Sequence, residues 1–420
     1  MVLSLSGAKM ARVSGIRSIM DDIATSRAEP SAAGWLNLSI GNPAPIPEVV
    51  TAWRRLFEQT LTTSFTAASC EYGPSRGTTT LVEAIADYFG RTYGWPVTAE
   101  NIVVGPGSQT LCFLAAAMFT GPGTGGRIVL PAVPDYTGYQ GLCLHADGVA
   151  GVAPAIQLAG ERRFRYSLDL DAVRRAPDLG MMLLSSPSNP VGRCLDRAEL
   201  DGLVEVAEQR GVPLIVDHAY GEPFPRIAET QVPPRWHDQV INVFTASKAG
   251  LPGERIGFAI GPARYVNPMV SFVSNSVLHA PQLAQLVVAR ALVTGELDRI
   301  TTTAIQPYYA AKRRTVEALL AQTLPSSVNW RLHVGSGGMF CWLWVDEPWF
   351  DDAALYRLMK SKRVFIVPGR PFFVDPLPGN GAMRAHESRC FRISLSPAEP
   401  VLQEGLARIA EALEELRRAH

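Results

Sequence analysis

Lys248 stands out because of the residues that surround it. It is one of five lysines in a sequence of 420 residues, and it lies between small side chains in the segment TASKAG. A lysine can attack a carbonyl carbon when its surroundings lower the pKa of its ammonium group, whereas an arginine stays charged. Lys248 is therefore a candidate nucleophile, although a lysine at the tip of a loop fits the same pattern.

A candidate anion site lies in the segment GPGSQT, ahead of a predicted helix. Ser108 and the free backbone N–H groups at the start of that helix are suited to hold a phosphate. Thr245, Ser247 and Arg255 add two hydroxyls and a fixed positive charge close in sequence to the lysine. A glycine-rich turn alone is weak evidence, but together these groups predict a phosphate beside Lys248.

Asp217 ends the apolar run VPLIVD, and a carboxylate directly after a buried strand is seldom left without a partner. The partner is either the turn that follows or a protonated ring nitrogen of a ligand. Tyr136 is placed to stack on such a ring, and Asn189 and Tyr220 are placed to hydrogen-bond a ring oxygen. A reactive lysine, a phosphate site and a carboxylate for a pyridinium are the requirements of pyridoxal 5′-phosphate (PLP), so the sequence predicts this cofactor.

The elements that must position these residues are short apolar runs, each followed by turn residues and then by a helical pattern. Such runs predict an α/β fold in which a mainly parallel sheet is covered by helices on both faces. Ligands of such sheets bind at the carboxyl ends of the strands, where the polar residues above are found. The runs cover residues 101–109, 126–136, 180–190, 212–225, 242–253 and 257–262.

The pattern changes near residue 300, where a long helical stretch leads into shorter strands and helices. We expect three parts: an N-terminal arm with part of a small domain at 1–50, a large cofactor-binding domain at 51–300, and a small α+β domain at 301–420.

Composition excludes several classes of protein. With 47% hydrophobic and 19% charged residues and a formal net charge of +0, the chain is typical of a globular protein and predicts neither a nucleic-acid nor a membrane partner. Its six cysteines form no CxxC pair, which predicts no metal site and a reducing compartment. No apolar run is as long as a membrane span, and the first residues lack the apolar core of an export signal. We therefore expect a cytoplasmic protein.

Several motifs occur in the order in which they are found in one enzyme family. The chain resembles the class I and II aminotransferases of fold type I, which bind PLP. The resemblance implies a large domain with a mainly parallel seven-stranded sheet flanked by helices, and a smaller C-terminal domain. It also implies transfer of an amino group between an aliphatic α-amino acid and a keto acid such as pyruvate. The motifs are GNPAPIPE, YGPSRGTTTL, VPDYTGY, PSNPVG, VDHAYGEPFP, SKAGLPGERIG and FRISL.

The resemblance also implies a role for each site residue. Lys248 would hold PLP as an internal aldimine and move the α-proton, while Asp217 would pair with the pyridine nitrogen. The remaining roles are these: Tyr136 stacks on the ring; Asn189 and Tyr220 bond its hydroxyl; Ser108, Gln109, Thr245, Ser247 and Arg255 surround the phosphate; Gly41, Asn189 and Arg392 receive the substrate carboxylate; and Tyr72 reaches the phosphate of the neighbouring subunit of a homodimer.

Three residues depart from the family pattern and leave the reaction open. His218 follows the aspartate, Glu222 stands where an apolar residue is usual, and Arg370 follows the segment VPG. An extra acid, base or cation near the substrate would suit a β- or γ-elimination, a replacement or a carbon–carbon bond formation through a quinonoid or vinylglycine-like intermediate. A PLP-binding regulator would need a basic DNA-binding domain, for which we expect no room because the resemblance begins near residue 7.

Overall fold

A computed structural model describes residues 2–11, 15–28, 34–121, 123, 126–145, 147–230, 232–335, 337–374 and 381–420. Parts of the predicted N-terminal segment at 1–50 lie outside these ranges. None of the helices that the structure describes is long and apolar enough to cross a membrane.

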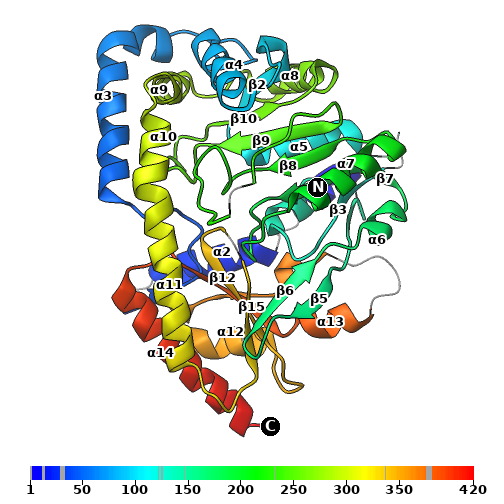
Figure 1. The fold of residues 1–420 in the computed structure, drawn as a ribbon, viewed down its shortest axis with the longest axis vertical. Coiled ribbons are helices and arrows are strands. Elements are labelled where there is room, and N and C mark those ends of the chain that lie inside the picture. Colours follow the sequence, from blue (N-terminus) through cyan, green and yellow to red (C-terminus); the bar gives the residue numbers. More distant parts are fainter. Residues whose placement is uncertain are drawn as a thin grey trace.

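A seven-stranded sheet forms the upper half of the molecule in Figure 1, in the order β2-β10-β9-β8-β7-β3-β4. Six strands are parallel, and β10 alone runs antiparallel, between β2 and β9. Buried residues dominate the strands, as expected for a sheet covered on both faces, and the predicted α/β architecture is confirmed. The strands are β2 (Ile102–Gly105), β3 (Arg127–Leu130), β4 (Val149–Gly151), β7 (Leu179–Ser185), β8 (Leu214–Asp217), β9 (Val240–Thr245) and β10 (Gly257–Ile260).

A second sheet of six strands lies in the lower half, in the order β14-β15-β12-β11-β6-β5. Two of its strands, β5 and β6, come from residues 155–167, within the range expected for the large domain. A short parallel pair joins β1 (Leu36–Asn37) to β13 (Val364–Phe365). The strands of the six-stranded sheet are β5 (Ala155–Leu158), β6 (Arg163–Ser167), β11 (Trp330–His333), β12 (Phe340–Val345), β14 (Val367–Pro368) and β15 (Cys390–Ser394).

Helices cover both sheets, and the sequence specifies the ends of some of them. In α7, Asp196 and Glu199 form a capping box, and Gly211 ends the helix with a φ of 63°. The helices are α1 (Leu5–Met10), α2 (Gly15–Ala28), α3 (Pro47–Ser69), α4 (Thr79–Tyr93), α5 (Ser108–Phe119), α6 (Leu170–Arg174), α7 (Arg197–Arg210), α8 (Ala263–Val277), α9 (Gln282–Val293), α10 (Glu296–Ile300), α11 (Gln306–Thr323), α12 (Asp352–Ser361), α13 (Gly381–Glu387) and α14 (Glu399–Arg418).

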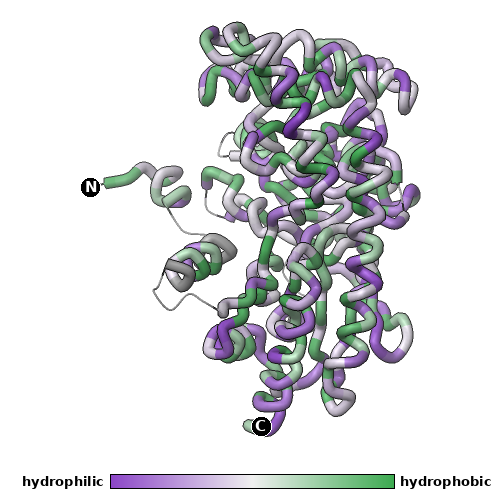
Figure 2. Tube along the Cα trace, turned by 90° about the vertical axis from the view of Figure 1, so that its left-hand side faces the viewer, coloured by the Kyte–Doolittle hydropathy of each residue, from purple (hydrophilic) through white to green (hydrophobic). Residues whose placement is uncertain are grey.

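Helix α1 stands apart from the main body of the molecule (Figure 2). Helix α1 contains no buried residue. Helix α2 is attached to α12, because Tyr356 donates a hydrogen bond of 2.8 Å to Asp22 and Lys360 forms an ion pair with the same carboxylate.

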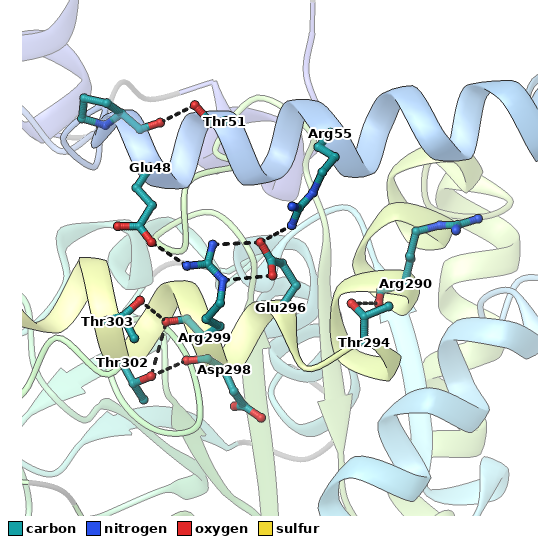
Figure 3. A network of polar contacts seen from close by, with 11 residues as sticks. Glu48, Thr51, Arg55, Arg290, Thr294, Glu296, Asp298, Arg299, Thr302 and Thr303 are labelled. Carbon is teal, nitrogen blue, oxygen red and sulfur yellow. Dashed lines mark hydrogen bonds and ion pairs between the residues drawn. The ribbon is translucent and has the colours of Figure 1, made fainter.

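The column of α10 and α11 runs along one side of the molecule from one sheet to the other (Figure 1). One turn of π-helix at 301–305 joins the two helices. Ion pairs fix α10 to α3 (Figure 3): Glu296 accepts from Arg55 at 2.6 Å and from Arg299 at 2.9 Å, and Arg299 also donates to Glu48 at 2.5 Å. Glu296 is the centre of this network because it binds both arginines. Its side chain is 11% exposed, whereas those of Arg55 and Arg299 are 57% and 42% exposed.

Glu296→Gln is expected to lower the free energy of unfolding at pH 7 by about 1 kcal/mol, as measured by urea denaturation. The arginines, chiefly Arg299, hold the pKa of Glu296 below its ordinary value. A lowered carboxyl pKa stabilises the fold above the ordinary pKa and loses that effect as the pH falls, so the difference between the proteins should shrink in acid.

Glu411→Gln is the matched control. Glu411 pairs with Lys362 at 3.5 Å, and its side chain is 64% exposed, so we expect little change in stability. If both variants lost the same free energy of unfolding, the low exposure of Glu296 would not explain the strength of its ion pairs.

Candidate active site

The carboxyl ends of neighbouring strands bring the predicted residues together. Asp217 is the last residue of β8, and it pairs in register with Ser185, the last residue of β7. Lys248 follows β9, the strand on the other side of β8. Because these strands are parallel, their ends lie along one edge of the sheet.

Lys248 has a hydrogen-bond acceptor but no carboxylate in direct contact among the described residues. Its Nζ donates to the carbonyl of Gly41 at 2.9 Å and lies 5.9 Å from the centre of the Tyr220 ring. Burial and the positive charge of Arg392 lower the pKa of Lys248 to about 8, against the opposing effect of Asp217. The uncharged fraction of the amine near neutral pH is therefore much larger than in an ordinary lysine, which favours nucleophilic attack.

Asp217 is 5% exposed and has two hydrogen-bond donors. One carboxylate oxygen accepts from the hydroxyl of Tyr139 at 3.0 Å and the other from the backbone N–H of Ala219 at 3.0 Å. Burial raises the pKa of Asp217 to about 6, and these hydrogen bonds oppose the rise. Tyr139 was not predicted as a site residue; the available signal was its position three residues after Tyr136, in the turn at 137–141.

Arg392, on β15 of the second sheet, is 4% exposed and forms no ion pair within the described chain. Its guanidinium donates to Asn189 Oδ1 at 2.8 Å and to the carbonyl of Ser39 at 2.9 Å, while its Nε has no partner. The charged group lies 3.9 Å from the centre of the Phe340 ring and 5.2 Å from that of Phe372. Burial lowers the pKa of Arg392 to about 10. A buried guanidinium with donors to spare is suited to bind a carboxylate.

The start of α5 is packed against Arg255. Gly107 precedes the helix with a φ of +89°, and a Cβ at this position would lie 2.5 Å from Arg255 Nη2, so only glycine fits. Arg255 Nη1 donates to Ser247 Oγ at 3.5 Å, and Thr245 Oγ1 donates to the same oxygen at 3.0 Å. Hydroxyls, a guanidinium and the N-terminus of the helix that begins at Ser108 therefore meet in one place.

The aromatic residues and Gln109 lie nearby. The Tyr136 ring packs edge-on against Tyr139 with centroids 5.2 Å apart, and Gln109 donates to the carbonyl of Gly138 in the same turn at 3.1 Å. Burial raises the pKa of both Tyr136 and Tyr220, and the charges of Asp217 and Arg392 act on both hydroxyls.

Tyr72 is the predicted residue that the fold leaves apart from this group. It is 86% exposed and contacts His279 edge-on, with ring centroids 6.0 Å apart.

Of the three departures from the family pattern, His218 is part of the protein interior. It stacks on Phe244 with centroids 4.9 Å apart, and its Nε2 lies 2.9 Å from Asn242 Oδ1. Since Asn242 donates through its amide nitrogen to the carbonyl of Arg235, its oxygen is the acceptor and His218 Nε2 carries the proton. Burial lowers the pKa of His218 to about 4, so the ring is neutral.

The two charged departures are bound to other side chains. Glu222 is 5% exposed and accepts from Arg226 at 2.8 Å and from the hydroxyl of Tyr93 at 3.3 Å. Arg370 forms ion pairs with both Asp351 and Asp352.

The seven-stranded, nearly parallel sheet and its surrounding helices have the architecture of fold-type I PLP-dependent enzymes. The chain belongs to the family "Aminotransferase class I and II", whose sequence profile matches residues 33–409, and it is accordingly a PLP-dependent aminotransferase.

Two similar aminotransferases and one further structure of the same fold can be compared with the chain. The chain is 30% identical over 418 residues to the valine–pyruvate aminotransferase of Escherichia coli K12, covering 99% of this chain and 98% of that protein. The structure of the valine–pyruvate aminotransferase of Salmonella typhimurium LT2 is similar, with a TM-score of 0.86, 28% identity and coverage of 97% and 100%. The fold is shared by the α-aminoadipate aminotransferase of Thermus thermophilus, solved with N-(5′-phosphopyridoxyl)-L-leucine, with a TM-score of 0.77, 22% identity and coverage of 100% and 98%.

The residues present fit PLP. The place where Gly107, Ser247 and Arg255 meet is suited to a phosphate. Asp217 offers a carboxylate to pair with a protonated pyridine nitrogen, and Lys248 offers an amine for the aldehyde.

Covalent attachment of PLP to the cofactor-free protein should become faster with rising pH, with a midpoint near the Lys248 pKa of about 8. The amine reacts only when neutral, and its pKa is below the ordinary value of 10.5. Arg392→Met should move the midpoint upward, because a nearby positive charge is removed. Initial rates of the absorbance change give both midpoints.

Arg331→Met is the control for this experiment, since Arg331 lies on β11 beside Asp346 and does not affect the pKa of Lys248. A wild-type midpoint at the ordinary lysine pKa would contradict the assignment of Lys248 as the activated amine.

Proposed function

We propose that the protein transfers the amino group of an aliphatic α-amino acid, such as valine, to a keto acid such as pyruvate. The observation that carries this proposal is the buried guanidinium of Arg392, which lacks a carboxylate partner in the described chain and influences the pKa of Lys248. The similarity to valine–pyruvate aminotransferases supports the choice of substrates.

Lys248 would hold the cofactor covalently and then move the substrate's α-proton. When bound, PLP supplies an aldehyde carbon for attachment to an amine and a ring that accepts the electron pair released by the broken Cα–H bond. Lys248 Nζ is suited to take and return that proton because its pKa is about 8. Asp217, with a pKa of about 6, is ionised at pH 7 and would keep a proton on the ring nitrogen.

Arg392 would bind the carboxylate of the substrate. Its N–H groups are only partly used by Asn189 and Ser39, so donors remain for a ligand. Asn189 accepts from the guanidinium and so orients it. Gly41, whose carbonyl accepts from Lys248 Nζ, belongs to the backbone next to this carboxylate site.

The other predicted residues would hold the cofactor itself. Tyr136 would stack on the ring, and Asn189 and Tyr220 would bond its hydroxyl. The proposed phosphate ligands are Ser108, Gln109, Thr245, Ser247 and Arg255.

An aliphatic substrate is favoured by the surroundings of Arg392, where the nearest rings are those of Phe340 and Phe372. The charged groups suited to expelling a leaving group are bound to other side chains, since Glu222 binds Arg226 and Arg370 binds two aspartates. We therefore propose transamination, and no contact of these residues favours elimination or replacement.

We further propose a homodimer in the cytoplasm. The exposed Tyr72 would reach the phosphate in the neighbouring subunit, and apolar residues on α3 and at the end of α8 are available for an interface. They include Leu61, Phe65, Val277 and Leu278, which are 40%, 53%, 41% and 54% exposed. Five described cysteines form no disulfide, as is usual in proteins of reducing compartments: Cys70, Cys112, Cys143, Cys341 and Cys390.

Valine alone should convert the bound cofactor to its pyridoxamine form, and pyruvate should then restore it with release of alanine. Absorbance spectroscopy and mass analysis of the products measure both half-reactions. Lys248→Ala should abolish them, and borohydride reduction should attach the cofactor to Lys248. Lys312→Ala, which alters a lysine bonded to the carbonyl of Pro397, should react as the wild type does. An unchanged spectrum with every aliphatic amino acid would refute the proposed reaction.

Tyr72→Ala should weaken PLP binding about tenfold, because a hydrogen bond to a charged phosphate is lost. In a heterodimer of one Tyr72→Ala chain and one Lys248→Ala chain, one site should then regain wild-type affinity and rate. That site has its own Lys248 and receives Tyr72 from the partner. A heterodimer as impaired as the Tyr72→Ala homodimer would show that Tyr72 does not act across the interface.

A further inference from the structure

Asp135 is a buried carboxylate within the motif VPDYTGY, and neither the sequence analysis nor the proposed mechanism gives it a role. It is 3% exposed, directly precedes Tyr136, and forms no ion pair with any described residue. A carboxylate is costly to bury without a cation, so its hydrogen bonds must compensate.

The donors to Asp135 come from the next residue, Tyr136, and from Ser185 at the end of β7. One carboxylate oxygen accepts from the backbone N–H of Tyr136 at 2.7 Å and from Ser185 Oγ at 2.5 Å. The other oxygen accepts from the backbone N–H of Ser185 at 3.1 Å. Asp135 thus joins the segment after β3 to the last residue of β7.

The contacts continue from Asp135 to Arg392 by two routes. Ser185 Oγ accepts from the backbone N–H of Asn189 at 3.2 Å, and Asn189 in turn accepts from Arg392 at 2.8 Å. The backbone N–H of Asp135 also donates to the carbonyl of Phe372 at 3.1 Å, and the Phe372 ring lies 5.2 Å from the Arg392 guanidinium.

We propose that Asp135 is a positioning residue that holds the Tyr136 segment and the Asn189–Arg392 pair in fixed relation, so that the cofactor ring and the substrate carboxylate are bound at a set separation. The inference rests on the proposed function in that Tyr136 stacks on the ring and Arg392 receives a carboxylate. Burial raises the pKa of Asp135 to about 7, and the hydrogen bonds from Ser185 and Tyr136 oppose the rise.

Both oxygens of Asp135 must act as acceptors because all three donors are directed at them. An asparagine would turn an NH₂ group toward either the backbone N–H of Ser185 or that of Tyr136, and two donors would then face each other. Asp135→Asn therefore disturbs the contact while nearly preserving the volume of the side chain.

The test uses the PLP-loaded protein and isovalerate, an unreactive carboxylate of the proposed substrate's shape. Asp135→Asn should raise the Kd of isovalerate, measured by calorimetry, and the KM of valine about tenfold, with a smaller fall in kcat. It should also change the circular dichroism of the bound cofactor, because the Tyr136 segment is released. Ser185→Ala removes the link to Asn189 but keeps the bond to the Tyr136 N–H, so it should raise the Kd of isovalerate and leave the circular dichroism unchanged.

Asp298→Asn is the matched control, since it makes the same change in a carboxylate that accepts from Tyr88 at 2.6 Å and touches no site residue. It should match the wild type in both measurements. Wild-type isovalerate binding and circular dichroism in Asp135→Asn would overturn the proposal. If that variant does not fold, unchanged isovalerate binding in Ser185→Ala would overturn it instead.

A wild-type protein that does not bind isovalerate would refute the proposed role of Arg392 rather than that of Asp135. The circular dichroism of Asp135→Asn would then still decide whether this residue holds the Tyr136 segment: a changed spectrum supports it and an unchanged one refutes it.

Discussion

Burial of three charged groups within one small volume is the constraint on which the arrangement of this protein depends. Lys248, Asp217 and Arg392 each have a pKa displaced mainly by desolvation, and their mutual charges oppose or add to that effect. Such groups need directed hydrogen bonds, because water is not available to solvate them. The carbonyls of Gly41 and Ser39 supply acceptors from the segment ahead of α3, and strand ends supply the rest. Both sheets must therefore meet at this point.

Much of the fold could be predicted from the sequence, because continuous apolar runs followed by helical patterns are typical of buried parallel strands. Six strands of the larger sheet were expected at the residues where they occur, whereas β4 has only three residues and gives too short a signal. The pairing of β5 and β6 with strands near residue 330 could not be predicted, since only long-range contacts determine it.

The sequence predicted that the site residues lie close together, because they stand at strand ends. It did not predict which other residues hold them in place. Tyr139 and Asp135 both lie in the motif VPDYTGY, but the motif gives neither of them a role, and their importance is visible only in hydrogen bonds across the fold. In the same way, Glu222 and Arg370 are unusual for the family in sequence, yet their ion pairs with Arg226, Asp351 and Asp352 explain them as parts of the fold.

The reversed direction of β10 has a consequence for how the protein can change in evolution. Because β10 pairs with β9 as a hairpin, with Gly257 opposite Thr245, the connecting loop leaves and re-enters the sheet at the same edge. Lys248 and Arg255 are therefore delivered by a single loop rather than by two separate crossovers. An insertion or deletion in this loop would displace both cations together, so its length is less free to vary than that of an ordinary surface connection.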